Sequence, residues 1–260
     1  MTDLILTEQN GAVGWIVFNN PARHNAVSLE MWQGADDALR AFQADDTVRL
    51  IAITGAGEKS FISGADISKF EDERAQAEAV AKYDSVSTGF VENLATTEKP
   101  TLARINGYCL GGGLNVALCC DLRIAAEGSQ FGIPAAKLGL GYSYKNFRRL
   151  VDVIGLANAR EITFTGERID TTRAHEMGLL NRVVTKADLD ETVNTMTETI
   201  AGNAPLTVRA GDWDLERRGD DDDELCDDAS DDEVGEMRET YSARDLTAPW
   251  IHIEDTVPPE

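Results

Sequence analysis

The chain has 260 residues and a formal net charge of −22 at pH 7, a length that suits one α/β domain of ordinary size with an appendage. Such an acidic chain repels nucleic acids and anionic membranes, so we expect neither as a partner. The sequence has no run of about 18 apolar residues, and its first ten residues lack the basic start and apolar core of a signal peptide.

The cysteines predict a reduced protein without a metal site. Cys109, Cys119 and Cys120 lie in one apolar stretch, and neighbouring residues of a helix point in different directions. Buried, unpaired thiols are typical of cytoplasmic proteins, which is the location we expect. No Cys/His spacing in the sequence matches a zinc site.

The amino-terminal part predicts a strand pair, a helix and a buried strand. Residues 4–6 and 13–18 alternate and are joined by Asn10-Gly11, a hairpin signal. Ser28 is a candidate N-cap for an amphipathic helix. The β-branched run at 50–54 predicts a buried strand. The face expected to be buried on the helix carries Trp32, Ala35, Leu39 and Phe42.

The middle of the chain alternates between strands and helices, which is typical of α/β layering. We expect a helix at 73–94 that stops before Pro100, and strands at 101–105 and 122–126. Residues 131–141 predict an irregular connection.

The last third predicts helices. Two short ones, 147–154 and 156–165, are separated by Gly155, and further helices are expected at 171–177, 186–200 and 206–225. An extended segment is expected at 181–184. The segment 219–236 has no Lys or Arg, and such blocks of like charge are usually solvated. We therefore expect a core domain at 1–200 and a divergent acidic helical region at 201–260.

Two glycine turns are the candidate parts of a binding or catalytic site. Gly111, Gly112 and Gly113 precede the apolar run 114–120, and the first N–H groups of a helix that begins there lack intrahelical partners and favour negative charge. A second turn, Gly64-Ala65-Asp66 in SFISGADI, follows the strand at 50–54. The first turn alone often serves only as a tight bend.

Together the two turns resemble those of the enoyl-CoA hydratase/isomerase (crotonase) superfamily. The similarity reaches to about Pro205 and includes PARHNAVS at 21–28, FGIPAAKLGLG at 131–141 and AHEMGLLNRVV at 174–184. It implies an α/β fold with a ββα spiral core and a C-terminal helical region that builds a homotrimer or a hexamer. It also implies an acyl-CoA thioester as substrate, with no cofactor besides the coenzyme A of that substrate.

The resemblance also assigns roles to residues. The backbone N–H groups of Ala65 and Gly112 would form an oxyanion hole for the thioester carbonyl. Asp66 would cap the helix that begins at Ile67, or act in catalysis. Arg23 would meet the nucleotide of coenzyme A or remain a solvated loop cation. The other residues expected to contact the substrate are Asn25, Ala26, Gly64, Ile67, Gly111, Ala135 and Tyr144.

The sequence departs from the hydratases at both catalytic glutamates. Asn115 and Ala135 stand in their places, and neither side chain accepts a proton near neutral pH. The stretch LGLGYSYK at 138–145 replaces a glycine-rich segment and brings Tyr142 toward the acyl pocket. Tyr142 would bond a carboxylate, donate a proton if its pKa were lowered, or only wall the pocket, whereas Lys145 is expected to be a surface cation.

Three functions remain open. The first is a glutamate-free reaction of an acyl-CoA through an enolate, such as decarboxylation. The second is hydrolysis of a thioester or a β-dicarbonyl, with a water held by Asn115. The third is a non-catalytic acyl-CoA-binding protein. His24 and His175 are expected to be structural or solvated, and no Ser or Cys stands in a context typical of a nucleophile.

Overall fold

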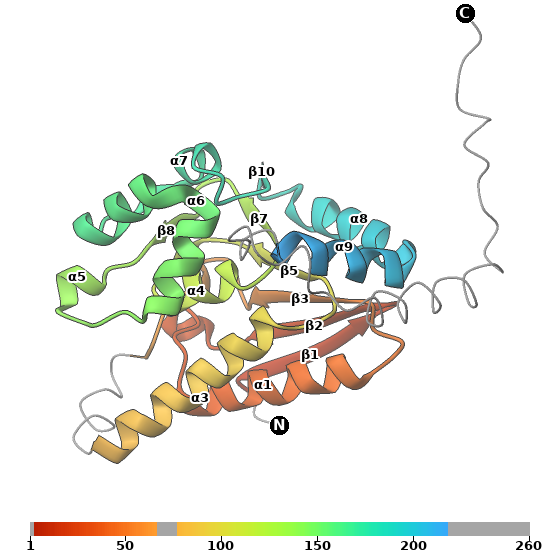
Figure 1. Cartoon of the computed structure of the whole chain (residues 1–260), viewed down its shortest axis with the longest axis horizontal. Coiled ribbons are helices and arrows are strands. Elements are labelled where there is room, and N and C mark those ends of the chain that lie inside the picture. The colour runs from red at the N-terminus through yellow and green to blue at the C-terminus, as the bar shows by residue number, and fades with distance from the viewer. Residues whose placement is uncertain (1–2, 67–76, 218–260) are drawn as a thin grey trace, which may run out of the picture. The chain divides into compact units, whose positions relative to one another are not determined.

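The computed structural model describes residues 3–66 and 77–217 (Figure 1). By its contacts the chain divides into two compact units, Met1–Arg209 and Ala210–Glu260. The first unit holds every element from β1 to α8. The domain boundary expected at residue 200 stays a prediction.

A six-stranded sheet forms the centre of the first unit. The strands β1 and β2 make the predicted antiparallel hairpin, with β1 extending to Asn10. All other neighbours in this sheet pair in parallel, as expected when helices connect the strands. In spatial order the strands are β1 (Ile5–Asn10), β2 (Val13–Phe18), β3 (Leu50–Gly55), β5 (Thr101–Ile105), β7 (Leu122–Ala126) and β10 (Arg182–Val184).

Both faces of this sheet are covered. In β3, Ile51 and Ile53 join the core cluster beneath helices α1 (Leu29–Ala44) and α3 (Ala77–Ala95), which lie side by side in Figure 1. The alternate residues of β3 pack with helix α8 (Leu189–Gly202) on the other face. The Ser28 hydroxyl accepts a hydrogen bond from Met31 N at 3.4 Å, and the predicted helix face is buried. These expectations are confirmed.

A second, four-stranded sheet was missed by the sequence analysis. Its strands are β4 (Ser60–Ile62), β6 (Tyr108–Leu110), β8 (Gln130–Gly132) and β9 (Ile169–Asp170). Strands of two or three residues are too short to show an alternating pattern, so their pairing depends on tertiary contacts. The irregular connection expected at 131–141 is therefore wrong: it contains most of β8 and the short helix α5 (Ala135–Leu138).

The two sheets build a spiral. Each turn runs from a strand of the large sheet to a strand of the small sheet and then to a helix, as in β5, β6 and α4 (Gly112–Leu118) or β7, β8 and α5. This arrangement agrees with the expected ββα spiral.

The helices after residue 140 lie close to the positions predicted from the sequence. Helix α6 (Tyr144–Thr165) is interrupted at Gly155, whose backbone is not helical, so the two predicted short helices are confirmed. Helices α7 (Thr171–Glu176) and α9 (Pro205–Arg217) begin at or next to their predicted first residues. Near the other end of the chain, η1 (Pro21–Arg23) is a single 3₁₀ turn. The acidic block 219–236 and the end of the helix predicted at 206–225 lie outside the described residues. No helix in the described ranges is long and apolar enough to cross a membrane.

Candidate active site

The pairing of two short strands brings the glycine turns together. Strands β4 and β6 are parallel neighbours in the small sheet, so their carboxyl ends lie at the same edge. Gly64-Ala65 follows β4, and Gly111-Gly112 follows β6. A Cβ built on Gly64 would lie 3.8 Å from Gly112 N, which places the two turns side by side.

Helix α4 packs closely against β4 through its second residue. A Cβ built on Gly113 would lie only 2.0 Å from the carbonyl oxygen of Ile62, so this position excludes any side chain. The helix consequently begins at Gly112, two residues earlier than the apolar run 114–120 suggested.

Two backbone N–H groups at this junction have no acceptor among the residues that the structure describes. In a bridge to Ala65, Val27 N donates to Gly64 O at 2.9 Å and Asp66 N donates to Val27 O at 3.1 Å. The N–H of Ala65 itself therefore points away from Val27. Gly112 N begins α4 and has no intrahelical partner. Within residues 3–66 and 77–217, neither N–H donates to a protein oxygen.

These turns border a pocket of about 320 Å³. Ala65, Gly112 and Asn115 line it, with the edge of Trp32 beside them. Residues of α3 and the beginning of α6 complete the described lining. Most of the surface that the described lining exposes to the cavity is apolar, and polar groups such as those of Ser87, Asn115 and Asn146 interrupt it.

Asn115 is the buried polar side chain of this pocket. It is 4% exposed, and its Oδ1 has no hydrogen-bond partner among the described residues. Native proteins leave few buried polar atoms unpaired, and such atoms often face a ligand or a water molecule. The Asn115 amide is therefore available to a group that enters the pocket.

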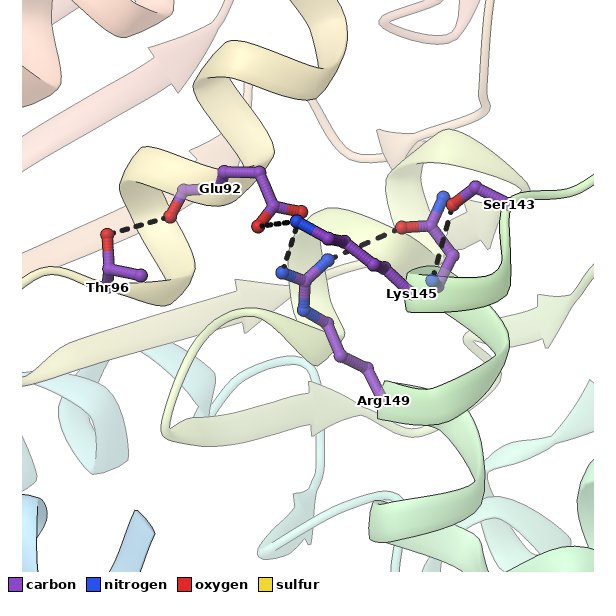
Figure 2. Close-up of polar contacts among 6 residues, drawn as sticks. Glu92, Thr96, Ser143, Lys145 and Arg149 are labelled. Carbon is purple, nitrogen blue, oxygen red and sulfur yellow. Dashed lines mark hydrogen bonds and ion pairs between the residues drawn. The ribbon is translucent and has the colours of Figure 1, made fainter. Parts of the chain in front are cut away.

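An ion-pair cluster that the sequence analysis missed joins α3 to α6 beside the pocket (Figure 2). Glu92 accepts hydrogen bonds from Lys145 Nζ at 2.9 Å and from Arg149 Nη2 at 3.0 Å. Burial acts to raise the pKa of Glu92, but the bonds from Lys145 and Arg149 outweigh it and hold the pKa below its ordinary value. Glu92 is therefore ionised at neutral pH. No local sequence signal points to this cluster, because Glu92 belongs to α3 whereas Lys145 and Arg149 belong to α6.

Comparisons with known proteins agree on one family. The model of the enoyl-CoA hydratase/isomerase family matches residues 8–226. A short-chain-enoyl-CoA hydratase of Clostridium acetobutylicum is 32% identical over 205 residues, which cover 79% of this chain and 78% of the relative. The crystal structure of an enoyl-CoA hydratase/carnithine racemase from Magnetospirillum magneticum superposes with a TM-score of 0.86 at 33% identity, covering 94% of this chain and 90% of that one.

The chain belongs to the enoyl-CoA hydratase/isomerase family. It is thus an enzyme of the crotonase superfamily, and the fold expected from the sequence is confirmed. The family also contains isomerases: a peroxisomal dienoyl-CoA isomerase of Arabidopsis thaliana is 29% identical over 217 residues, which cover 79% of this chain and 78% of the relative.

The two tyrosines considered for the enoyl-CoA hydratase/isomerase site have different surroundings. Tyr144 lines the pocket and is 76% exposed. Tyr142 is absent from the described lining; its hydroxyl makes a long bond of 3.5 Å to Gly111 O. Burial raises the pKa of Tyr142, and nearby Cys119 adds to the effect. This shift is opposite to the lowered pKa that proton donation by Tyr142 would need, and a catalytic role for Tyr142 stays a prediction.

The residues expected to contact coenzyme A lie in a loop that is held by hydrogen bonds and an ion pair. Arg23 Nη1 contacts both carboxylate oxygens of Asp66 at 3.0 Å, so Arg23 is not simply a solvated cation. Asn25 is fully buried and its amide donates to Ala56 O and Ser60 O. Ala26 is half-buried beside it. These bonds shape the loop; its contact with coenzyme A stays a prediction.

Two further predicted residues lie away from the described pocket lining. Ala135 is half-buried at the start of α5, outside the set of described residues that line the pocket. Ile67 lies outside the described residues, and with it the helix that Asp66 was expected to cap.

Other nucleophiles and metal ligands find no support in the described residues. Burial raises the pKa of the Cys119 thiol to about 12 and raises those of Cys109 and Cys120 as well, so these thiols stay protonated. Nδ1 of His175 lies 2.9 Å from Leu180 O, a structural contact, and His24 sits at the end of η1. Within the described ranges, no group of three or more His, Cys, Asp or Glu residues is placed to hold a metal ion.

Proposed function

We propose that this enzyme binds an acyl-CoA thioester with its carbonyl oxygen between the N–H groups of Ala65 and Gly112. The observation that carries the proposal is the meeting of these two unpaired donors at the edge of the pocket. Negative charge grows on the thioester oxygen when an enolate forms, and two fixed donors stabilise it. One such donor typically contributes roughly 10²–10³ in rate.

The reaction that fits the side chains best is one that needs no glutamate pair. In decarboxylation of a malonyl-type acyl-CoA, the electron pair of the breaking C–C bond moves to the α-carbon as CO₂ leaves. The resulting enolate oxygen is held by Ala65 and Gly112, and the α-carbon then takes a proton from water. The first step requires no protein acid or base, which suits Asn115 and Ala135 at the glutamate positions.

Asn115 supports a second candidate, hydrolysis of the thioester. Its side chain lines the pocket, and its Oδ1 has no partner among the described residues, which supports a role for the amide in orienting a water molecule. Addition of that water to the carbonyl would again place charge on the oxygen between Ala65 and Gly112. The product distinguishes the two reactions, because only hydrolysis of the thioester releases free coenzyme A.

A mass-spectrometric turnover screen tests the proposal. The substrates are crotonyl-CoA, methylmalonyl-CoA, a branched enoyl-CoA and a β-ketoacyl-CoA. Loss of CO₂ from methylmalonyl-CoA would support decarboxylation, and free coenzyme A would support hydrolysis. A gain of one water on the enoyl substrates would show hydration without glutamates and overturn the assignment. Binding without turnover of any substrate would instead indicate a non-catalytic acyl-CoA-binding protein.

Three further properties complete the proposal. The enzyme needs no cofactor besides the coenzyme A of its substrate, works in the cytoplasm and assembles as a homotrimer or a hexamer of two trimers. Light scattering would test the assembly, since it should give a mass three or six times that of the chain. Activity that survives exhaustive dialysis against a chelator would support the absence of a metal.

A further inference from the structure

Charged and polar side chains gather in one part of the pocket lining, at the beginning of α6. Ser143, Tyr144, Lys145 and Asn146 are consecutive and all line the pocket at the beginning of α6. In a pocket whose lining is mostly apolar, a few placed polar groups fix the orientation and the identity of the ligand.

The charges around this part of the lining do not cancel. Glu92 is the sole carboxylate among the described residues that line the pocket, and it is shared by two cations, Lys145 and Arg149. The three groups together carry one net positive charge. This local excess is notable in a chain with a net charge of −22.

Lys145 is the cation that a substrate can reach. Its side chain is 66% exposed and lines the pocket, whereas that of Arg149 is 19% exposed and is not among the described lining residues. An ammonium group has three donors, and the described contacts give Lys145 one hydrogen bond, to Glu92. Arg149 also contacts Asn146 Oδ1 at 3.4 Å, so the cluster is fixed to the start of α6 (Figure 2).

Asn115 provides a second, independent indication of a polar ligand. Its side chain is 4% exposed, lines the same pocket and leaves Oδ1 unpaired among the described residues. An amide offers both donors and an acceptor. The pocket therefore presents a buried neutral amide on α4 and a separate group of side chains from α3 and α6 with a net positive charge.

We propose that the pocket selects acyl groups that carry a second carboxylate at the end far from the thioester, and that Lys145 binds this carboxylate. The inference rests on the proposed function only in that an acyl-CoA occupies the pocket. A cation stabilises a carboxylate that keeps its charge and opposes its loss as CO₂. The carboxylate at Lys145 is therefore one that survives the reaction.

Matched pairs of acyl-CoA ligands test this selectivity. Succinyl-, glutaryl- and adipyl-CoA are compared by calorimetric titration with butyryl-, pentanoyl- and hexanoyl-CoA, which lack the second carboxylate. We expect one diacid to bind on the order of tenfold more tightly than its matched monoacid, as is typical of a hydrogen bond to a charged group. The acyl chain length that gives the largest ratio of diacid to monoacid affinity indicates the distance from the thioester to Lys145.

Two lysine substitutions locate the effect. In Lys145→Met the ratio should fall to about one, and in Lys145→Arg it should largely persist because the charge remains. Lys186→Met is the matched control, because Lys186 also pairs with a glutamate at 2.9 Å but is not among the described residues that line the pocket. It should leave the ratio unchanged. Thermal unfolding confirms that each variant is folded.

The outcomes separate this inference from the proposed function. If diacid and monoacid ligands bind equally, or if Lys145→Met keeps the preference, the selectivity is overturned while acyl-CoA binding stands. If none of the six ligands binds, the proposed function fails and the selectivity fails with it.

Discussion

Two buried asparagines show how the same side chain serves different purposes. Asn25 is fully buried; its Oδ1 accepts from Asn20 N at 2.9 Å and its Nδ2 donates to Ser60 O at 2.8 Å. Its backbone lies in the left-handed region at φ 54°, which asparagine tolerates better than most residues. Asn115 is almost as buried but has an unpaired Oδ1. Asn25 therefore stabilises the fold. The unpaired oxygen of Asn115 destabilises it, and a ligand that bonds to this oxygen would offset the loss.

Alanine substitution should separate these two roles. We expect Asn25→Ala to lower the free energy of unfolding by about 3 kcal/mol or more, because it leaves buried partners unsatisfied. Asn115→Ala should change it by no more than about 1 kcal/mol, because its unpaired oxygen contributes no bond. Urea denaturation measures both. An equal loss in the two variants would mean that Asn115 has a structural partner and does not face a ligand.

At the scale of the element, helix α6 depends on a break in its own geometry. Gly155 has φ 75° and ψ 159°, a combination open essentially to glycine, and it lets the helix change direction. Gly89 in α3 is a glycine within a regular helix. A Cβ at either position would meet nothing within 4 Å, so the two sites differ in backbone conformation and not in space.

This pair of glycines gives a test of backbone strain alone. Gly155→Ala should lower the free energy of unfolding by about 1–3 kcal/mol, since the new side chain is strained at positive φ. Gly89→Ala should raise it by roughly 0.5–1 kcal/mol, because alanine favours a helix. Both values come from chemical denaturation. A stabilising Gly155→Ala would show that α6 can run straight through this position.

The other element that positions the site is α4, and a buried cation closes its far end. Arg123 is 7% exposed; its Nε donates to Leu179 O at 2.8 Å, and its Nη1 donates to Ala117 O at 3.2 Å and to Cys120 O. The last carbonyl groups of a helix have no partners within the helix. The guanidinium supplies donors at that end while Gly112 stands at the other.

Removing this cation should destabilise the protein strongly. We expect Arg123→Met to lower the free energy of unfolding by about 3 kcal/mol or more, because several buried carbonyl groups lose their donor at once. Arg40→Met is the control; its side chain is 62% exposed and pairs with Asp36 on the same helix. That change should cost no more than about 0.5 kcal/mol. Comparable losses in both variants would contradict the role given to Arg123.

At the scale of the whole molecule, charge sets the response to salt. With a net charge of −22, the chain repels itself in the compact state. Salt shortens the range of this repulsion, since the screening length is about 10 Å at 0.1 M and 3 Å at 1 M. The melting temperature should therefore rise between roughly 0.05 and 0.5 M salt. Sodium chloride and potassium chloride should raise the melting temperature equally. A lower melting temperature in either salt would mean that stabilising ion pairs outweigh the repulsion.

Long elements with a clear period were predictable, and short elements were not. The face of α1 with Trp32 and Leu39 follows from its spacing, and the buried strand β3 follows from its β-branched residues. The three-residue strands β4 and β6 have no period to detect, although they place both glycine turns. Their pairing depends on segments far apart in the sequence.

The candidate site likewise contains residues that local motifs predicted and residues that they did not. Ala65, Gly112 and Asn115 were found because each belongs to a local motif, and the structure brings all three to one pocket. Glu92 and Lys145 belong to different helices, and their contact exists only after α3 and α6 have docked. No local pattern contains that information, so Lys145 was expected to be an ordinary surface cation.

The parallel pairing of β4 with β6 has a consequence for the order of events during folding. Residues 63–107 must be closed into a loop before these strands meet, and closing a long loop costs entropy before any contact offsets it. Parallel sheets with such distant partners fold slowly. Ala65 and Gly112 thus face a common pocket only after this closure, so ligand recognition depends on a long-range strand pairing and not on local structure.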